Sequence, residues 1–330
     1  MSYWFETDTF VPHPLLGNAH LQTMVTSRIK RPLPADWDQV QTKKITLFDN
    51  SEILCRYVIR DPGAPTLFIL HGMAGSHRSR YVLGLTEKTR VLGWNAVFPD
   101  LYDVSTFGKP PTVFHSGCSR LLDDLLRQVA AELSLTRVFI SGVSMGGNIL
   151  LKMIGEWGSS YPEWVTGAAV ISPLTDLPGS TLLLELPSTV VYRTRFLKKL
   201  RNSMLQKAVR YQKYPDAGEA LKARTIRQFD EAFTVPLSGF GSADEYYETQ
   251  SSQHVLSSIQ LPTYIVHSKD DPLLTCTALE SDSVQKNPFI TLCFTEKGGH
   301  VGFLASRPDG DRGRYWAENR ILDYLENRIR

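Results

Sequence analysis

The chain has 330 residues, of which 42% are hydrophobic and 21% are charged, and its 36 lysines and arginines nearly balance its 34 aspartates and glutamates. This composition is typical of a soluble globular protein with enough apolar residues for a large core. The formal net charge of +2 gives no indication of nucleic-acid binding, and no apolar run approaches the roughly 18 residues of a membrane-spanning helix.

The cysteines and the N-terminus favour a cytoplasmic protein. Cys55, Cys118, Cys276 and Cys293 are widely spaced and form neither a C-x-x-C pair nor a cysteine–histidine pattern typical of zinc sites. We therefore expect free thiols in a reducing compartment. The first ten residues, MSYWFETDTF, contain acids and lack the basic and apolar regions of a secretory signal.

The elements predicted along the chain begin with an arm and continue as alternating strands and helices. Residues 1–36 are rich in proline and aromatic residues, so we expect residues 1–42 to form an irregular N-terminal arm laid on the body of the protein. A hairpin is predicted for 43–48 and 52–59, and the continuous apolar run ending at Gly72 is typical of a strand buried on both faces. Further strands are predicted at 95–100, 137–142, 167–172, 262–268 and 288–294, and helices at 79–93, 118–133, 146–158 and 315–329. This alternation predicts an α/β fold, with a mostly parallel central sheet flanked by helices.

The alternation is interrupted once. From Pro173 to about Ile259 the sequence is helical, polar and broken by prolines. We predict that residues 174–258 form a helical cap inserted into a core made of residues 43–173 and 259–330. Caps and lids lie in this position in open α/β sheets, after the carboxyl end of a strand.

Ser144 is the candidate nucleophile. It lies in the G-x-S-x-G sequence of residues 142–146, after a predicted strand and before a predicted helix. This is the setting of a nucleophile elbow, in which a sharp, strained turn exposes the serine hydroxyl. Gly142 and Gly146 remove Cβ atoms that would collide across such a turn. The alternative is a plain strand-to-helix turn in which glycine only serves packing.

A serine hydroxyl needs a base, and the base needs an orienting acid. His300 is the best candidate base, because it lies in a glycine-rich loop directly after a predicted strand; the alternative is a surface-loop histidine. Asp270 and Asp271 follow the preceding strand. We favour Asp271, since the residue before a proline is held extended, and Asp270 stays the alternative. The chain order Ser, Asp, His is that of an α/β hydrolase.

An oxyanion hole needs two backbone donors. One is expected from the N–H of Met145, directly after the nucleophile, and the other from the N–H of Met73, in the loop after an earlier strand. His71 precedes this loop, and we expect it to brace the loop rather than to act in catalysis.

The sequence predicts neither a metal nor a nucleotide cofactor. No two of the remaining histidines lie four residues apart on a credible helix with an acid nearby. Neither a G-x-G-x-x-G sequence after a strand nor a G-x-x-x-x-G-K-[ST] sequence occurs.

The segment 192–215 is the most strongly basic part of the predicted cap. Leu197, Leu200 and Met204 recur in it at three- and four-residue spacing, surrounded by lysines and arginines. Such a helix usually packs its apolar stripe on its own protein and leaves its charges in water. Contact with a membrane surface is the alternative, weaker interpretation.

Several motifs together resemble the YheT-like hydrolases, a bacterial branch of the α/β-hydrolase superfamily that is related to the ABHD1–3-type lipid esterases of eukaryotes. These motifs are HGMAGS at 71–76, GVSMGGN at 142–148, HSKDDP at 267–272 and GGHVGF at 298–303. The resemblance extends to LLGNAHLQTM at 15–24, FHSG at 114–117, IRQFDEAFT at 226–234 and GFGSADEYY at 239–247. It implies that Ser144 is the nucleophile, His300 the base and Asp271 the acid.

We therefore expect a serine hydrolase that cleaves carboxylic esters, with short- to medium-chain or lipid-like acyl groups, through an acyl-enzyme on Ser144. Transfer of the acyl group to an alcohol or amine is one alternative. A binding protein that keeps the hydrolase fold without catalysis is the other.

Overall fold

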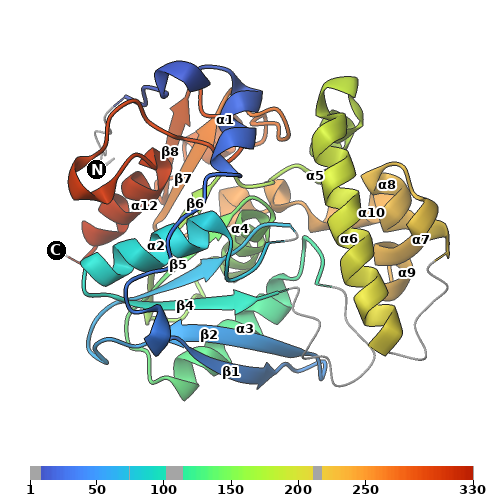
Figure 1. Ribbon diagram of the computed structural model, residues 1–330. Helices are drawn as coiled ribbons and strands as arrows, with labels where there is room; N and C mark the ends of the chain where they lie inside the picture. The colour runs from blue at the N-terminus through green and yellow to red at the C-terminus, as the bar shows by residue number, and fades with distance from the viewer. Residues whose placement is uncertain (1–8, 74, 102–113, 211–217, 330) are drawn as a thin grey trace.

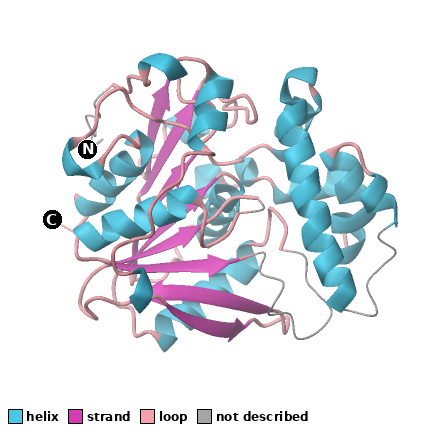
Figure 2. Ribbon diagram, viewed as in Figure 1, coloured by secondary structure: helices cyan, strands magenta, loops and turns pink. Residues whose placement is uncertain are grey.

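The computed structural model describes residues 9–73, 75–101, 114–210 and 218–329. Residues 1–8 of the predicted arm and 211–217 of the predicted cap lie outside these ranges. Within them, eight strands form one sheet in the order β1-β2-β4-β3-β5-β6-β7-β8, with helices on both faces (Figures 1 and 2). The strands are β1 (Gln41–Thr46), β2 (Glu52–Val58), β3 (Thr66–Leu70), β4 (Asn95–Asp100), β5 (Val138–Val143), β6 (Val165–Ile171), β7 (Thr263–Ser268) and β8 (Ile290–Thr295).

The sheet confirms the predicted fold. The hairpin β1–β2 is antiparallel and β2 runs antiparallel to β4, whereas the pairs from β4 to β8 are all parallel. All residues of β3, β4, β5 and β7 are buried. For β3 this burial explains the continuous apolar run in the sequence, because helices cover both faces of the strand.

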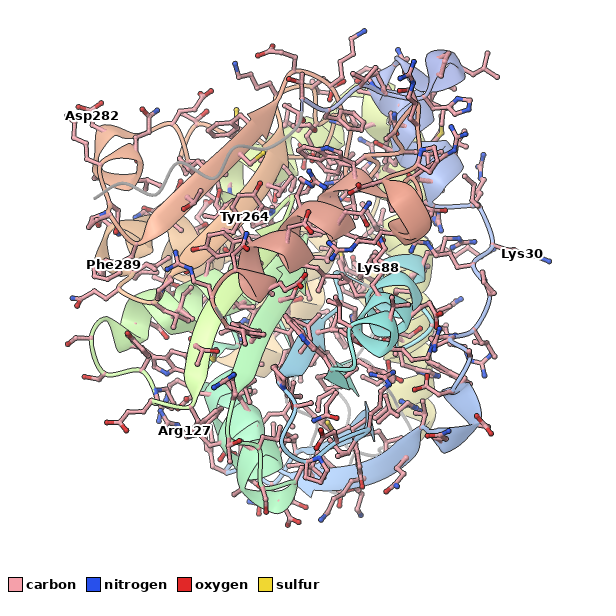
Figure 3. All side chains as sticks on the ribbon, turned by 90° about the vertical axis from the view of Figure 1, so that its left-hand side faces the viewer. Lys30, Lys88, Arg127, Tyr264, Asp282 and Phe289 are labelled. Carbon is pink, nitrogen blue, oxygen red and sulfur yellow. The ribbon has the colours of Figure 1, made fainter. Side chains whose placement is uncertain are left out.

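The helices divide between the two faces. On one face, α2 (Arg80–Val91) and α12 (Trp316–Glu326) pack on β3, β4, β6 and β7, and on the other α3 (Ser119–Glu132) and α4 (Met145–Trp157) pack on β1, β3 and β5. A short helix, α11 (Asp282–Gln285), precedes β8. Figure 3 looks onto the first face, where Tyr264 of β7 lies beneath α12 and stacks on Tyr324 at 4.9 Å between ring centroids.

The N-terminal arm is more regular than predicted. It contains the helix α1 (Ala19–Thr26), which begins where the Asn18 side chain accepts hydrogen bonds from the backbone N–H groups of His20 and Leu21. An asparagine in this position stabilises a helix start, since it satisfies donors that have no partner within the helix. The prediction of an irregular arm was therefore wrong over this segment, and β1 begins at Gln41, two residues inside the predicted arm.

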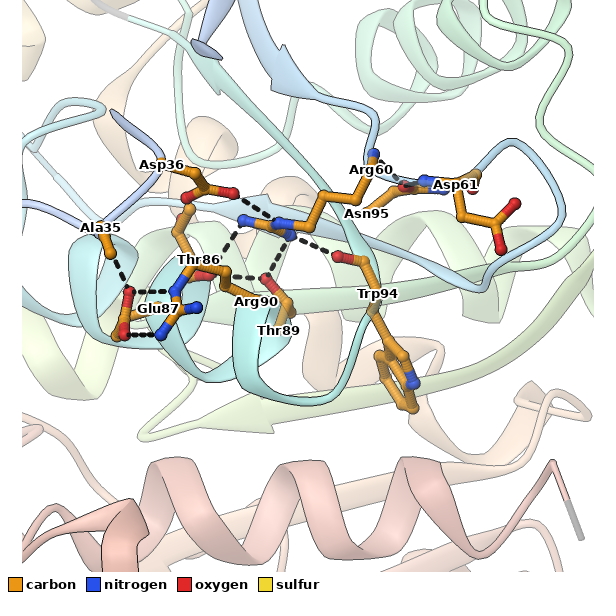
Figure 4. Close-up of polar contacts among 10 residues, drawn as sticks. All are labelled: Ala35, Asp36, Arg60, Asp61, Thr86, Glu87, Thr89, Arg90, Trp94 and Asn95. Atoms are coloured by element: carbon orange, nitrogen blue, oxygen red, sulfur yellow. Dashed lines mark hydrogen bonds and ion pairs between the residues drawn. The ribbon is translucent and has the colours of Figure 1, made fainter. Parts of the chain in front are cut away.

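Polar contacts fix the arm to the body of the protein. The Arg60 guanidinium donates to Asp36 of the arm (Nε–Oδ2 2.6 Å) and to the carbonyl of Trp94, and the N–H of Ala35 donates to Glu87 of α2 (Figure 4). Farther along, Glu318 of α12 binds both Arg31 of the arm (2.6 Å) and Lys88 of α2 (2.8 Å). Because these side chains are buried, removal of Glu318 would leave two buried cations without their carboxylate.

The cap lies between β6 and β7 in the sequence and to one side of the sheet (right in Figure 1). Leu197 and Met204, of the stripe predicted in the basic segment, are 4% and 1% exposed, so this stripe packs inside the protein. No described helix has the length and apolar character needed to cross a membrane. The elements of the cap are α5 (Leu177–Glu185), α6 (Val190–Arg210), α7 (Gly218–Lys222), α8 (Ile226–Phe229), a π-helical turn (Asp230–Thr234), α9 (Val235–Ser238) and α10 (Ala243–Gln250).

Candidate active site

The turn between β5 and α4 places Ser144 in a strained conformation. Ser144 has φ 56° and ψ −121°, a region that residues with a Cβ adopt at a cost of roughly 1–3 kcal/mol. A Cβ on Gly142 would lie 2.5 Å from the carbonyl oxygen of Gly146, and a Cβ on Gly146 would lie 2.5 Å from that of His71. The two glycines are thus required by close backbone contacts, as the elbow interpretation predicts.

Three loops at one edge of the sheet bring Ser144, His300 and Asp271 together. His300 Nε2 lies 3.0 Å from Ser144 Oγ, and His300 Nδ1 lies 2.8 Å from Asp271 Oδ2. The three residues follow β5, β8 and β7, which are parallel strands, so their loops meet at the carboxyl edge of the sheet. Both distances allow a hydrogen bond, so a proton can pass between the serine and the imidazole.

The two neighbouring aspartates have different contacts. Asp271 faces the imidazole, and its second oxygen accepts from the N–H groups of Leu273 (2.9 Å) and Leu274 (3.2 Å). Asp270 accepts from the N–H of Gly299, one residue before His300 (2.8 Å). Asp270 therefore holds the histidine loop, while Asp271 touches the histidine itself.

Asp271 carries its negative charge despite complete burial of its side chain. Burial by itself raises the pKa of this carboxyl, but the charge and hydrogen bond of His300, helped by the charge of His267 and the Leu273 N–H, outweigh it. The resulting pKa lies below the ordinary value for aspartate. An ionised Asp271 is the form that can orient the His300 Nδ1–H and stabilise a positive charge on the ring.

His71 braces the loop that follows β3. Its Nδ1 hydrogen-bonds the Gly72 carbonyl (2.9 Å), so Nδ1 carries the proton, and its Nε2 accepts from the N–H of Leu101 (3.1 Å). Burial lowers the pKa of His71 and keeps the ring neutral. The loop passes close to the elbow, because a Cβ on Gly72 would lie 3.0 Å from Ser144 Cβ. Met73 comes next, and Met145 is the first residue of α4.

Two cavities reach Ser144 and His300. The first cavity lies between core and cap and has mainly apolar walls. It also contains the buried carboxyl of Asp230, which accepts hydrogen bonds from the hydroxyls of Thr234 (2.6 Å) and Tyr247 (2.8 Å). Burial raises the pKa of Asp230 to about 6. Its apolar walls include Leu177, Leu184, Phe196, Leu200, Met204 and Phe233. The second cavity lies under the N-terminal arm, shares Met73, Ser144, Phe196 and His300 with the first, and has a basic wall.

The sequence reasoning missed the contribution of the arm. Thr23 of α1 accepts a hydrogen bond from the backbone N–H of His300 (2.8 Å). The buried Gln22 side chain accepts from the N–H of Leu304 (3.1 Å) and donates to its carbonyl (3.2 Å). The arm thus holds the histidine loop on both sides of its turn. The motif at 15–24 contains both Gln22 and Thr23, and it was the one feature of the sequence that could have indicated a role of the arm at the site.

No group of three or more histidine, cysteine, aspartate or glutamate side chains in the described ranges is arranged to hold a metal ion.

Comparisons with known proteins show the family to which the chain belongs. The family model for serine aminopeptidase, S33, matches residues 62–281. YheT of Escherichia coli, classed as an esterase, is 28% identical over 326 residues, which cover 96% of this chain and 92% of that protein. The human phospholipase ABHD3 is 26% identical over 90% of this chain and 74% of its own. Among solved structures, the Pyrococcus furiosus esterase Pf2001 superimposes with a TM-score of 0.60 at 16% identity, covering 97% of this chain and 99% of its own. The chain therefore belongs to the serine aminopeptidase S33 family of α/β hydrolases and, within it, to the YheT- and ABHD-like proteins.

Proposed function

We propose that this esterase- or lipase-type hydrolase cleaves carboxylic esters through an acyl-enzyme on Ser144. The observation that carries the proposal is the continuous chain of hydrogen bonds from Asp271 through His300 to Ser144 Oγ. It ends in a cavity whose walls are mainly apolar. A nucleophile, a base and an orienting acid in this order are the groups that acyl transfer from an ester requires.

The first half of the reaction forms the acyl-enzyme. The His300 Nδ1–H donates a hydrogen bond to the ionised Asp271. This leaves Nε2 unprotonated, so that it can take the Ser144 proton as the hydroxyl oxygen attacks the ester carbonyl carbon. The carbonyl π electrons move to the oxygen, and the backbone N–H groups of Met73 and Met145 stabilise the oxyanion. When the tetrahedral intermediate collapses, the carbon–oxygen bond to the alcohol breaks and His300 gives its proton to the leaving alcohol.

Water completes the cycle. It enters where the alcohol left, loses a proton to His300 Nε2 and attacks the acyl carbon. The bond to Ser144 Oγ then breaks, and His300 returns the proton to the serine. The carboxylic acid leaves and the starting protonation states are restored.

The first cavity is suited to an acyl chain. Leucine, phenylalanine and methionine side chains from core and cap surround it, and burial of each methylene group against such walls contributes about 0.8 kcal/mol. We expect short- to medium-chain acyl groups. The relatives support lipid-like esters as the substrate class, because they include a phospholipase and a monoacylglycerol lipase from Saccharomyces cerevisiae.

The test is hydrolysis of p-nitrophenyl esters of graded acyl length. We expect Ser144→Ala to lower kcat roughly 1000-fold or more, whereas Ser160→Ala, an exposed serine just beyond α4, leaves it unchanged. A fluorophosphonate probe is expected to label Ser144. A wild type that is inert on the whole series and unlabelled, or an alanine variant as active as the wild type, would overturn the proposal.

A further inference from the structure

Four cationic side chains line the second cavity: Arg31 of the arm, which is paired with Glu318, and three others from two helices. Arg80 lies at the start of α2, and Arg195 and Lys199 lie four residues apart on α6. Ser144 and His300 line the same cavity. A substrate bound at Ser144 therefore has a cationic wall on this side and an apolar cavity on the other.

Among the described residues, two of these cations have no acidic partner. In the described part of the chain, no carboxylate lies within 4.0 Å of the Arg80 or Arg195 guanidinium, and both donate to neutral groups of the arm. Arg80 donates to the carbonyls of Ile29 (2.6 Å) and Arg28 (3.2 Å), and Arg195 to the Ser27 hydroxyl (3.3 Å). Among the described residues that line the cavity, the one carboxylate is that of Glu318, which is already bound by Arg31 and Lys88.

The closeness of these positive charges destabilises the folded protein. Like charges four residues apart on a helix repel each other, and Arg195 and Lys199 have this spacing. Burial, followed by the charges of Arg195 and Arg80, lowers the pKa of Lys199; burial, followed by the charge of Arg195, lowers that of Arg80. Three cations that repel each other around one cavity attract an anion there, and the guanidinium groups offer paired N–H donors that match the oxygens of a phosphate or carboxylate.

The position of the anion within the substrate follows from the two cavities. The acyl chain of an ester fits the apolar cavity, so the alcohol part extends into the other one. We propose that Arg80, Arg195 and Lys199 form a subsite for an anionic group, a phosphate or a carboxylate, on the alcohol part of the ester. This inference rests on the proposed function, because it takes Ser144 as the point of attack.

The experiment compares octanoyl esters that differ only in the charge of the alcohol. Glycerol is the neutral alcohol, glycerol 3-phosphate carries the phosphate, and glycerate carries the carboxylate. At low ionic strength we expect kcat/KM for at least one anionic ester to exceed that for the glycerol ester by about tenfold or more, with the preference shrinking in 0.5 M NaCl. The phosphate and carboxylate arms show which anion the subsite takes.

The variants are Arg195→Gln and Lys199→Gln, with Lys198→Gln as the matched control, an exposed lysine on the same helix that does not line either cavity. Each subsite variant is expected to lower kcat/KM on the preferred anionic ester about five- to tenfold and to leave the glycerol ester within about twofold. The control is expected to change neither. Equal kcat/KM on all three esters, or equal losses on neutral and anionic esters, would overturn the subsite while leaving the hydrolase intact.

Binding supplies a readout that does not need catalysis. Calorimetric titration of the wild type with glycerol 3-phosphate and with glycerate is expected to show binding that the Arg195→Gln, Lys199→Gln double variant weakens about tenfold or more. If no ester is hydrolysed but this difference is found, the proposed function fails and the anion subsite stands. Titrations in which neither anion binds, or in which the double variant binds as the wild type does, would overturn the subsite.

Discussion

Replacing Thr23 with valine tests whether the arm positions the catalytic histidine. Valine keeps the shape of threonine but removes the oxygen that accepts from the His300 N–H at 2.8 Å and donates to the Ala19 carbonyl at 2.8 Å. Because the site is buried, the orphaned N–H costs about 1–3 kcal/mol. At roughly 2.1 cal/mol/K per residue over 330 residues, this loss corresponds to a fall in Tm of about 1.5–4 °C.

The effect on activity comes from the displacement of the imidazole. If the loop relaxes by a fraction of an ångström, the His300 Nε2 contact to Ser144 Oγ lengthens from 3.0 Å and proton transfer slows. We expect kcat on p-nitrophenyl butyrate to fall about 10- to 100-fold, with KM within about twofold, since the acyl cavity is unchanged. Thr23→Ser restores the hydroxyl and is expected to recover most of kcat.

Thr89→Val is the matched control. Thr89 is buried on α2, donates to the Thr86 carbonyl (2.8 Å) and accepts from Arg60 (3.4 Å) (Figure 4). It therefore has a similar bonding pattern, and it lines neither of the two cavities at Ser144. It is expected to lower Tm by a similar amount and to leave kcat unchanged. A Thr23→Val enzyme with wild-type kcat, or a Thr23→Ser enzyme as slow as Thr23→Val, would refute a positioning role for Thr23.

Three further predictions concern the elbow, the paired aspartates and the cap. Gly146→Ala forces a Cβ to within 2.5 Å of the His71 carbonyl oxygen, so we expect a loss of stability of about 1–3 kcal/mol and a fall in kcat of more than about tenfold; unchanged urea unfolding and kcat would show that the turn can relax. Asp271→Asn is expected to lower kcat roughly 1000-fold or more. Asp270→Asn keeps an amide oxygen that can accept from the Gly299 N–H, so it is expected to lower kcat by less than about tenfold; a larger loss in Asp270→Asn than in Asp271→Asn would make Asp270 the orienting acid. Burial raises the pKa of the Asp230 carboxyl from 3.8 to about 6, so the folded state binds the carboxyl proton more tightly than the unfolded state does. Protonated Asp230 therefore stabilises the fold below pH 3.8, and this stabilisation is lost as the pH rises through about 6. Urea unfolding of Asp230→Asn is measured beside the wild type from pH 4 to 7. Over this range the free energy of unfolding of the variant is expected to rise relative to that of the wild type by up to about 3 kcal/mol; a difference independent of pH would contradict the raised pKa.

The sheet and the elbow could be predicted because their signals are local. A strand covered on both faces is mostly apolar, and the sharp turn at Ser144 requires glycine at 142 and 146. The proline argument favoured Asp271, and Asp271 is the one that touches His300. The division into arm, core and cap, the roles of Ser144, Asp271, His300, Met73 and Met145, and the cytoplasmic location stay predictions.

The missed features depend on contacts between distant segments. Gln22 and Leu304 are 282 positions apart, and nothing near either residue indicates the pairing. The basic segment was interpreted from its own periodicity, which accounts for the buried Leu197 and Met204. Arg195, Arg80 and Ser144 line one cavity only because the fold brings α6, α2 and the elbow together there.

The most direct test of Ser144 as the nucleophile is mass spectrometry of the enzyme quenched with acid during turnover of p-nitrophenyl butyrate. The structure predicts a butyryl group on the peptide that contains Ser144, present while substrate remains, lost once it is consumed, and absent from Ser144→Ala. A butyryl group on a different residue, or turnover by Ser144→Ala at the wild-type rate, would contradict an acyl-enzyme at the elbow.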